Sequence, residues 1–456
     1  MSATPTTFSV DRLREGLEGR VIVPGDPDYD EARAVTYGGI DPRPGAIVRV
    51  ANADDVARVV RFAREARAEL AVRSGGHSGA GHSTTDGGIV IDLRELKEID
   101  LDVGARRVWA GAGLTAGELT AAVTPHGLVV GFGDTASVGL GGITTGGGVG
   151  YLVRRDGLTI DNLIGAEVVT ADGEVLTVDA DNHSDLFWGI RGGGGNFGVV
   201  TKFHYRLNEL PEFFGGMLVL PATAETIAGY VAAAEAAPEE LSTIANIMNA
   251  PPMPFLPEEV IGSVVILGMI GFAGDAESAE RAVAPFRALA EPLADMLKPM
   301  PYAEMFPPED PDYHPTAVSV NMHIDHVDAE AAATIVEFLG KSDATLRAAQ
   351  LRVLGGGMAR VPSDATAYAH RSSKIMVNLA AFYEGADDKA PKEAWLRDFA
   401  AALDQGDPAV YCNFMADESP ERVRQAYPGS TWDRLVEIKR RYDPTNLFRR
   451  NQNVTP

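Results

Sequence analysis

The stretch Arg73-Ser74-Gly75-Gly76-His77-Ser78-Gly79 begins where the strand-like run LAVRS (residues 70–74) meets a glycine-rich loop. Glycines let backbone amides approach a bound anion closely, because no Cβ stands in the way. Consecutive amides that point inwards form a nest with a fixed partial positive charge. The stretch therefore predicts a loop pressed against a ligand, with His77 inside it.

A second glycine-rich block covers residues 131–150, where nine of twenty residues are glycine. Such a density would destabilise an ordinary helix or strand by roughly 0.5–1 kcal/mol per position relative to alanine. Flexible linkers are usually Ser-rich or charged, whereas this block contains Val138, Leu140, Ile143 and Val149. We therefore expect a second ligand-binding loop rather than a linker.

A third cluster, RGGGGNFGVV (residues 191–200), has Gly193, Gly195 and Gly198 at the G-x-G-x-x-G spacing of nucleotide-binding loops. That fingerprint needs a helix directly afterwards, but the following run is typical of a strand. The pattern argues against a Rossmann fold and leaves this loop as a further amide-lined cradle.

The overall composition limits the classes of partner. Forty Lys and Arg residues against 64 Asp and Glu give the 456-residue chain a formal charge of −24, so nucleic acid and anionic lipid are poor partners. The longest apolar run, residues 264–272, is about half of a bilayer span, and residues 1–20 lack the apolar stretch of a signal peptide. With one cysteine, Cys412, no internal disulfide is possible. We expect a cytoplasmic protein with a small-molecule substrate and no nucleic-acid or membrane partner.

The composition and the secondary-structure patterns of the sequence change after Leu210. Before it, a helix pattern from Asp54 and strand-like runs at 88–93 and 108–113 surround the glycine-rich loops. After it, prolines interrupt strand-like runs at 263–272 and 318–327, with helix patterns at 225–237 and 276–294 between them. These patterns predict an α+β fold whose second domain has an antiparallel sheet covered by helices on one face.

Seven segments, in order, carry a resemblance to a known family. They are RSGGHSG (73–79), GLGGITTGGGVG (139–150), DGLTIDNLIGAEVVTADGEVLTV (156–178), DLFWGIRGGGGNFGVVT (185–201), LGGGMARVPSDATAYAHR (354–371), YCNF (411–414) and YDPTNLFRRNQN (442–453). The chain resembles the berberine bridge enzyme-like flavoproteins of the vanillyl-alcohol-oxidase superfamily over roughly residues 40–455. The resemblance implies a PCMH-type FAD-binding domain at 1–210 with its core at about 40–210, a substrate-binding domain at 211–415, and a C-terminal segment at 416–456 that returns to the FAD domain.

The family attaches the 8α-methyl group of its flavin to the histidine of a Gly-Gly-His motif, which corresponds to His77. His82 is the rival nucleophile, but it lacks the preceding glycine pair. Many relatives add a second link through a cysteine where this chain has Thr135, so one covalent bond is expected. The other residues that the resemblance assigns to FAD binding are Arg73, Ser74, Gly75, Gly76, Ser78, Gly79, His82, Ser137, Val138, Gly139, Gly142, Gly146, Gly147, Gly148, Gly150, Gly198, Val199, Val200, Asn413, Asn451 and Gln452.

The electron acceptor is expected to be dioxygen, reduced to hydrogen peroxide. In relatives the residue after the Val-Gly of the second loop influences access of dioxygen to the reduced flavin, and this chain has Leu140 there. Its bulk leaves open a dehydrogenase with a non-oxygen acceptor, and a plain packing role for Leu140 is equally compatible with the sequence.

The Tyr-x-Asn motif of the family corresponds to Tyr411-Cys412-Asn413. Period-2 alternation on a strand would place Tyr411 and Asn413 on one side. The resemblance makes Tyr411 a catalytic residue that takes a proton from a substrate hydroxyl as hydride leaves for flavin N5. Because an unperturbed tyrosine has a pKa near ~10, a nearby cation or hydrogen-bond donor would have to lower it.

Tyr151 and Asn378 are the other catalytic candidates. Some bacterial relatives also have a tyrosine at the position of Tyr151, near the flavin. Asn378 occupies the nearest match to a glutamate of plant members, so a carboxylate base is missing and the burden shifts to Tyr411. Gln350 and Arg352, alternate residues ahead of Gly355, would line the same cavity or lie on the strand surface.

No metal site is expected. His323, Asp325 and His326 lie close in sequence, but on a strand they cannot all face one ion, and no distant partner completes them. The sequence thus predicts an FAD-dependent oxidase that oxidises a CH–OH group of a sugar or secondary metabolite, with a CH–NH or activated C–H group as a further option. A non-catalytic flavin-carrying protein is the remaining alternative, and the presence of the Tyr-x-Asn pair argues against it.

Overall fold

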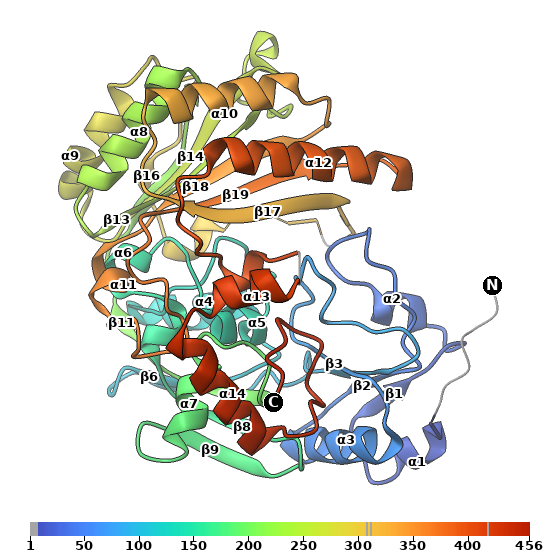
Figure 1. Ribbon diagram of the computed structural model, residues 1–456. Helices are drawn as coiled ribbons and strands as arrows, with labels where there is room; N and C mark the ends of the chain where they lie inside the picture. Colours follow the sequence, from blue (N-terminus) through green and yellow to red (C-terminus); the bar gives the residue numbers. More distant parts are fainter. Residues whose placement is uncertain (1–7, 307–308, 311, 417–418) are drawn as a thin grey trace.

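The computed structural model describes residues 8–306, 309–310, 312–416 and 419–456. Within these residues the strands form three main sheets and one short two-stranded pairing. Two sheets lie in the lower half of Figure 1, and the largest lies in the upper half beneath a layer of helices. The mixture of helices and mainly antiparallel sheets confirms the predicted α+β class. No helix in the described part of the chain has both the length and the apolar character needed to cross a bilayer.

The first sheet is built from the N-terminal quarter of the chain. Its order is β1 (Arg20–Ile22), β2 (Ala46–Arg49), β4 (Ile89–Asp92) and β3 (Leu70–Arg73), with β2, β4 and β3 parallel. Helix α3 (Ala53–Ala66) starts at Asn52, whose side chain accepts the backbone N–H of Asp55, and buries its predicted apolar stripe in the core beside this sheet. Strand β3 leads straight into the Gly75-Gly76-His77 loop, which fixes where that loop starts.

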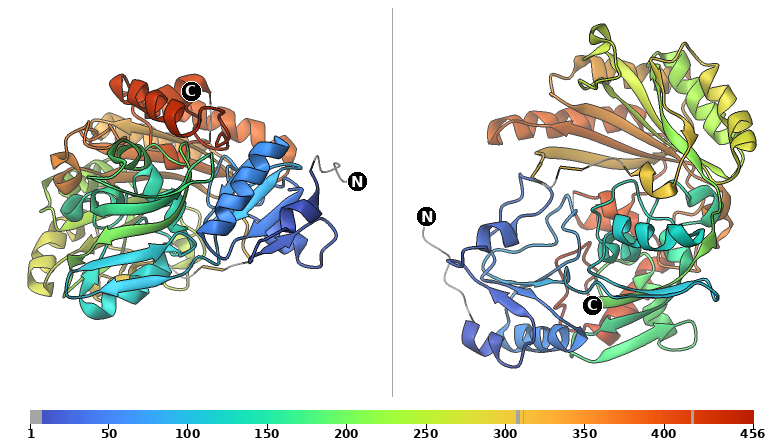
Figure 2. Two further views of the ribbon diagram at one scale, coloured as in Figure 1. Left: turned by 90° about the horizontal axis from the view of Figure 1, so that it is seen from below. Right: turned by 180° about the vertical axis from the view of Figure 1, so that it is seen from behind.

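The second sheet is antiparallel and carries the other two glycine-rich loops. Its order is β5 (Ile99–Asp102), β6 (Arg107–Gly111), β10 (Val199–Arg206), β8 (Leu163–Val169) and β9 (Val175–Asp179). Strand β10 directly follows the 192–198 glycine cluster, as the sequence predicts, so a strand stands where a Rossmann loop would need a helix. The view from behind in Figure 2 shows this cyan-to-green sheet beside the blue N-terminal one.

The largest sheet forms the roof of the molecule. Its path is β15 (Ala294–Asp295), β12 (Phe214–Pro221), β14 (Val264–Phe272), β13 (Leu241–Asn249), β18 (Arg347–Val353), β19 (Ile375–Phe382) and β17 (Ala317–Ile324), with β16 (Lys298–Pro299) also paired to β12. Helices α8 (Ala224–Ala236), α9 (Ala276–Arg287), α10 (Ala329–Lys341) and α12 (Ala386–Leu403) cover its upper face (Figure 1). The predicted one-sided layer of helices is therefore present, and the lower face of the sheet is left for the cavity.

Two local expectations differ from the structure. Helix α9 ends at Arg287, earlier than the predicted residue 294, because residues 294–295 form an edge strand against β12. Tyr411 lies just before a 3-10 helix, Cys412–Phe414, and not on a strand. The period-2 argument for Tyr411 and Asn413 was therefore wrong, although their side chains do meet.

The C-terminal segment packs onto the lower half of the molecule. Helices α13 (Pro420–Ala426) and α14 (Ser430–Tyr442) lie there in Figure 1, in red. The fully buried Lys439 donates hydrogen bonds to the carboxylate of Asp443 and to the backbone oxygens of Asn196 and Phe448, at 2.7–2.8 Å. One side chain thus joins α14, the third glycine loop and the tail. The boundaries at residues 210 and 415 stay predictions, and Val410, Cys412 and Met415 pack with the lower core.

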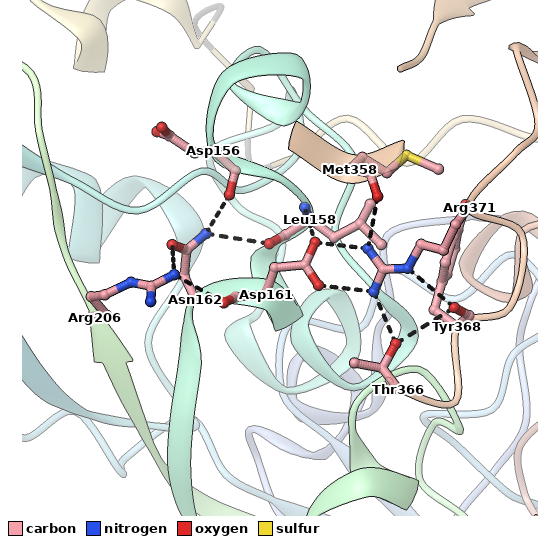
Figure 3. A network of polar contacts seen from close by, with 9 residues as sticks. All are labelled: Asp156, Leu158, Asp161, Asn162, Arg206, Met358, Thr366, Tyr368 and Arg371. Atoms are coloured by element: carbon pink, nitrogen blue, oxygen red, sulfur yellow. Dashed lines mark hydrogen bonds and ion pairs between the residues drawn. The ribbon is translucent and has the colours of Figure 1, made fainter. Parts of the chain in front are cut away.

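A buried ion pair connects the two halves (Figure 3). Arg371, which precedes β19, donates from both Nη atoms to the carboxylate of Asp161 on the 3-10 helix Thr159–Asn162, each at 2.8 Å. Arg371 also donates to the side chain of Thr366 and the backbone oxygens of Met358 and Tyr368. Arg371 therefore holds the roof on the lower half.

Candidate active site

A cavity lies between the roof and the lower half, and residues from all three sheets or the loops beside them line it. The predicted site residues on its wall are Ser74, Gly75, Gly76, His77, Ser78, Gly79, His82, Val138, Gly139, Gly142, Gly198, Val199, Val200, Asn378, Tyr411, Asn413, Asn451 and Gln452. The structure therefore brings together loops that lie far apart in the chain, from Ser74 near the N-terminal end to Gln452 near the C-terminal end.

The first two glycine loops pack directly on each other. A Cβ on Gly75 would lie 2.2 Å from the backbone nitrogen of Gly139, and a Cβ on Gly139 would lie 2.2 Å from Ser74 Oγ. Ser74 Oγ donates to the backbone oxygen of Ala112 and accepts the N–H of Gly141. In contrast, a Cβ on Gly79, Gly142 or Gly195 would meet nothing within 4 Å, and these three glycines line the cavity. Only some of the glycines therefore keep space open for a ligand.

His77 stands on the cavity wall, mostly buried. Its Nε2 lies 2.9 Å from Ser137 Oγ, and Ser137 donates from Oγ and from its backbone N–H to the two carboxylate oxygens of Glu309, at 2.6 and 2.8 Å. Burial lowers the pKa of His77, while the carboxylates of Glu309 and Asp134 and the contact with Ser137 oppose that shift. Burial therefore favours the neutral form of the imidazole. His82 lines the same cavity, and burial with the nearby Arg450 lowers its pKa to about 4.

Seven predicted site residues do not line the cavity: Arg73, Ser137, Gly146, Gly147, Gly148, Gly150 and Tyr151. Arg73 is buried against Asp92 and the backbone oxygen of Ala32, so it holds β3 and β4 in place. The four glycines pack against protein atoms. A Cβ on each would meet, respectively, the side chain of Asn413, the rings of Tyr368 and Tyr411, Thr159 Oγ1 and the backbone oxygen of Phe132. These glycines allow close internal packing, and their contact with a cofactor stays a prediction.

Tyr151 also lies away from the cavity wall. It is buried in an apolar cluster with Leu210, Phe213 and Tyr302, and burial raises its pKa well above the usual range. Leu140 is fully buried in the lower core and does not line the cavity either. Leu140 thus packs in the core, and its influence on access of dioxygen stays a prediction.

Tyr411 occupies the roof side of the cavity as a doubly hydrogen-bonded phenol. Its oxygen accepts the backbone N–H of Gly148 and Nδ2 of Asn413, both at 2.9 Å. Asn321 on β17 fixes its backbone by accepting the Tyr411 N–H at 2.7 Å. Burial raises the pKa of Tyr411 above its usual range, because desolvation outweighs the two donors and Arg352. The pKa of Tyr411 is therefore raised and not lowered as expected. The phenol stays protonated and can donate its own hydrogen.

A row of four carboxamides crosses the lower face of the roof. Asn246, Gln350, Asn378 and Asn321 are directly opposite one another on β13, β18, β19 and β17. Gln350 Nε2 donates to Asn246 Oδ1 at 2.8 Å, whereas Asn378 Oδ1 is buried without a hydrogen-bond partner among the described residues. Because Asn378 lines the cavity, this oxygen is an acceptor available to a bound molecule.

Arg352 joins the roof to the second glycine loop. It donates to Asp134 at 2.7 Å, to the backbone oxygen of Val149 at 2.8 Å and to Gln350 Oε1, and its guanidinium lies over the Phe414 ring. Arg352 lines the cavity, as one of the two sequence interpretations had it, and Gln350 supports it from behind.

Several cavity residues were missed by the sequence analysis. They include Tyr37, Asp134, Ser319, Phe414 and Arg450. Asp134, Phe414 and Arg450 lie inside stretches that the sequence analysis singled out, beside residues it did name, whereas nothing local in the sequence marks Tyr37 and Ser319. Cys412 points away from the cavity, with its thiol against the backbone oxygen of Gly146.

The three residues once considered as metal ligands are dispersed. His323 is buried with Nδ1 on the backbone oxygen of Ala409, while His326 is exposed beside Asp328. Within the described residues no group of three His, Cys, Asp or Glu side chains could hold an ion.

Comparison with known proteins identifies the cofactor. The chain is 30% identical to (R)-6-hydroxynicotine oxidase of Paenarthrobacter nicotinovorans over 96% of this chain and 97% of the relative. The chain belongs to the berberine bridge enzyme-like FAD-linked oxidoreductases. Within this family, residues 44–179 match the FAD binding domain, and residues 410–455 match the berberine and berberine-like segment.

Solved structures of berberine bridge enzyme-like proteins share the whole fold. The crystal structure of 6-hydroxy-D-nicotine oxidase from Arthrobacter nicotinovorans is 29% identical, with a TM-score of 0.88 over 98% of this chain and 100% of that one. The BBE-like 1 protein of Physcomitrella patens is 21% identical, with a TM-score of 0.87 over 98% of both chains, and shows the same architecture.

The residues present fit FAD. Gly79, Gly142 and Gly195 keep space open beside backbone amides, as a diphosphate requires. Leu70, Val72, Ile143 and Val149 add an apolar wall on which a flat ring system can rest. As a member of this family the chain is an FAD-linked oxidoreductase, and bound flavin supplies the two-electron chemistry.

Proposed function

We propose that this FAD-linked oxidoreductase is an oxidase whose flavin is attached covalently through His77. The observation that carries the proposal is the placement of His77: a largely buried imidazole on the wall of the glycine-lined cavity, with Ser137 holding Nε2 and with burial favouring the neutral ring. A neutral imidazole keeps a lone pair for bond formation, which an imidazolium lacks. Dioxygen as electron acceptor is supported by the oxidase names of the similar proteins.

Tyr411 works on the substrate side as a hydrogen-bond donor. Because its oxygen already accepts two hydrogen bonds and burial keeps it protonated, its remaining hydrogen is directed to a heteroatom of the substrate. A protonated phenol cannot take a proton from an alcohol. This favours oxidation of a carbon that bears an amine nitrogen, since an unprotonated amine can give up hydride without a base. Nicotine derivatives, which the named relatives oxidise, are amines.

Oxidation of a CH–OH group remains the second candidate function. The observation that favours it is Asn378, whose buried amide oxygen lines the cavity and can accept a hydrogen bond from a hydroxyl group of a sugar or a secondary metabolite. Because Tyr411 is already protonated, an alcohol would then have to transfer its hydroxyl proton to another group.

The covalent bond can be tested directly. Purified protein is precipitated with acid, and the absorbance of the pellet and the supernatant is recorded for wild type, His77→Ala and His82→Ala. We expect yellow pellets for wild type and His82→Ala and a colourless pellet for His77→Ala. A colourless wild-type pellet would show that the flavin is not tethered.

The reaction class is tested by reducing the flavin and then reoxidising it. Anaerobic mixing of the oxidised enzyme with panels of secondary and tertiary amines, sugars and alcohols should bleach the flavin absorbance with amines first. Stopped-flow mixing of the reduced protein with air-saturated buffer should restore it rapidly. Slow reoxidation would assign the chain to the dehydrogenases instead.

A further inference from the structure

Glu309 and Ser137 form a polar chain to His77 that the reaction described above does not use. Glu309 lies in the segment between the 3-10 helix Tyr302–Met305 and β17, 172 residues from Ser137. Its carboxylate accepts both the backbone N–H and the Oγ–H of Ser137. A surface carboxylate from the roof is thus connected to the cavity wall of the lower half.

The direction of each hydrogen bond follows from the number of protons available. A carboxylate only accepts, and a serine hydroxyl has a single hydrogen. Since Ser137 Oγ donates to Glu309 Oε1, it must accept from His77 Nε2, which therefore carries the hydrogen of the neutral ring. The lone pair of the neutral ring then lies on Nδ1. The chain of contacts selects one tautomer and leaves one nitrogen nucleophilic.

We propose that Glu309 and Ser137 form a proton relay that drives covalent attachment of the flavin to His77. The inference rests on the proposed tether. His77 Nδ1 forms a bond to the 8α carbon, one C–H bond of the 8α-methyl group breaks, and the Nε2 proton passes through Ser137 to Glu309. Two electrons and the methyl proton are released toward the ring system, which is thereby reduced. Dioxygen then takes up two electrons and two protons to give hydrogen peroxide. Overall, the imidazole N–H, one methyl C–H and dioxygen are converted to the new N–C bond and one hydrogen peroxide.

The charges around His77 fit this role. Two carboxylates, Glu309 and Asp134, act on the ring, but Asp134 is already paired with Arg352. Glu309 is exposed, so it can pass an acquired proton to solvent after each event. Glu309 acts through Ser137 and is a positioning and proton-accepting residue, not one that touches the flavin.

The relay is tested by the rate of tether formation, not by turnover. Protein produced under riboflavin limitation is mixed with FAD, and acid-stable flavin is measured over time by fluorescence of the denatured protein on a gel. Glu309→Gln and Ser137→Ala should form the tether at least tenfold more slowly than wild type. The control is Asp310→Asn, which also removes one negative charge. Asp310 follows Glu309 directly but is not the residue that contacts Ser137, so this variant should form the tether at the wild-type rate.

Three further readouts decide the outcome. Added formate should restore the rate in Glu309→Ala, because the exposed site admits a small carboxylate, and a purely structural role would not respond. Reversible FAD binding, measured by fluorescence quenching at the start of the reaction, should be equal in wild type and in the Glu309 and Asp310 variants. Loss of that binding in Glu309→Gln, or a wild-type tethering rate in it, would overturn the relay, whereas a wild type without tether would refute the proposed function instead.

Discussion

Arg371 and Asp161 face each other as a two-pronged ion pair, with each guanidinium Nη atom 2.8 Å from a carboxylate oxygen and both side chains less than a tenth exposed. The pair lies between the roof and the lower half, so it controls how the two walls of the cavity meet (Figure 3). Removing one partner would leave a buried charge without compensation.

We expect Asp161→Asn to lower the free energy of unfolding by about 3–5 kcal/mol. Urea denaturation followed by tryptophan fluorescence measures this change. The control is Arg281→Met, which breaks an exposed pair with Glu277 on α9 and should leave the midpoint nearly unchanged. If Asp161→Asn were as stable as wild type, the ion pair between Arg371 and Asp161 would not be what holds the two halves together.

Tyr411→Phe should lower kcat at least tenfold, because the hydrogen donated to the substrate is lost. It should also cost about 1–3 kcal/mol of stability, since the buried N–H of Gly148 loses its acceptor. Tyr368→Phe is the matched control: its ring packs on Tyr411, but its hydroxyl has no hydrogen-bond partner in the described part of the chain. Comparable activity of the two variants in steady-state assays would contradict the assignment.

Asn378→Leu should raise KM about tenfold or more while it leaves FAD binding intact. The reason is that Asn378 Oδ1 is a buried acceptor on the cavity wall that only a bound molecule can satisfy. Asn246→Leu removes a carboxamide of the same row at a position off the wall and should change KM less. The check is a steady-state comparison with the best substrate of the panel, and an unchanged KM in Asn378→Leu would reject the role.

The stability of the protein should fall as pH drops from about 6.5 to about 4. Burial lowers the pKa of His323 to about 4, so the unfolded chain takes up a proton in this window that the folded chain refuses. His323→Gln should flatten that pH dependence by roughly 2–4 kcal/mol across the window. Urea melts at several pH values test this, with the exposed His326→Gln as control. Parallel curves for His323→Gln and wild type would contradict it.

The sequence predicted the parts of the site that are continuous in the chain. His77, Ser74 and Gly142 lie on the cavity wall as expected, because a loop that follows strand β3 or enters helix α5 (Leu140–Gly146) has little freedom to go elsewhere. The helical cover of the largest sheet was also predictable, since amphipathic helices between strands must pack on it.

Other placements depend on contacts between distant segments. The resemblance assigned Gly148 and Gly150 to the cofactor, and in the structure a Cβ at these positions would meet Thr159 and Phe132. A glycine in a sequence indicates that another group approaches the backbone closely, but it does not identify that group. Likewise Asp134 becomes a cavity residue only through Arg352, 218 residues away.

The tail adds a consequence for how the protein is made. Phe448, Arg450, Asn451 and Gln452 complete the cavity wall, and Gln452 donates to the backbone oxygen of Cys412 while Lys439 fixes Phe448. A nascent chain still attached to the ribosome cannot close this wall before those residues have emerged from the exit tunnel. Capture of the cofactor in a complete cavity therefore has to wait until residues 448–452 have left the tunnel.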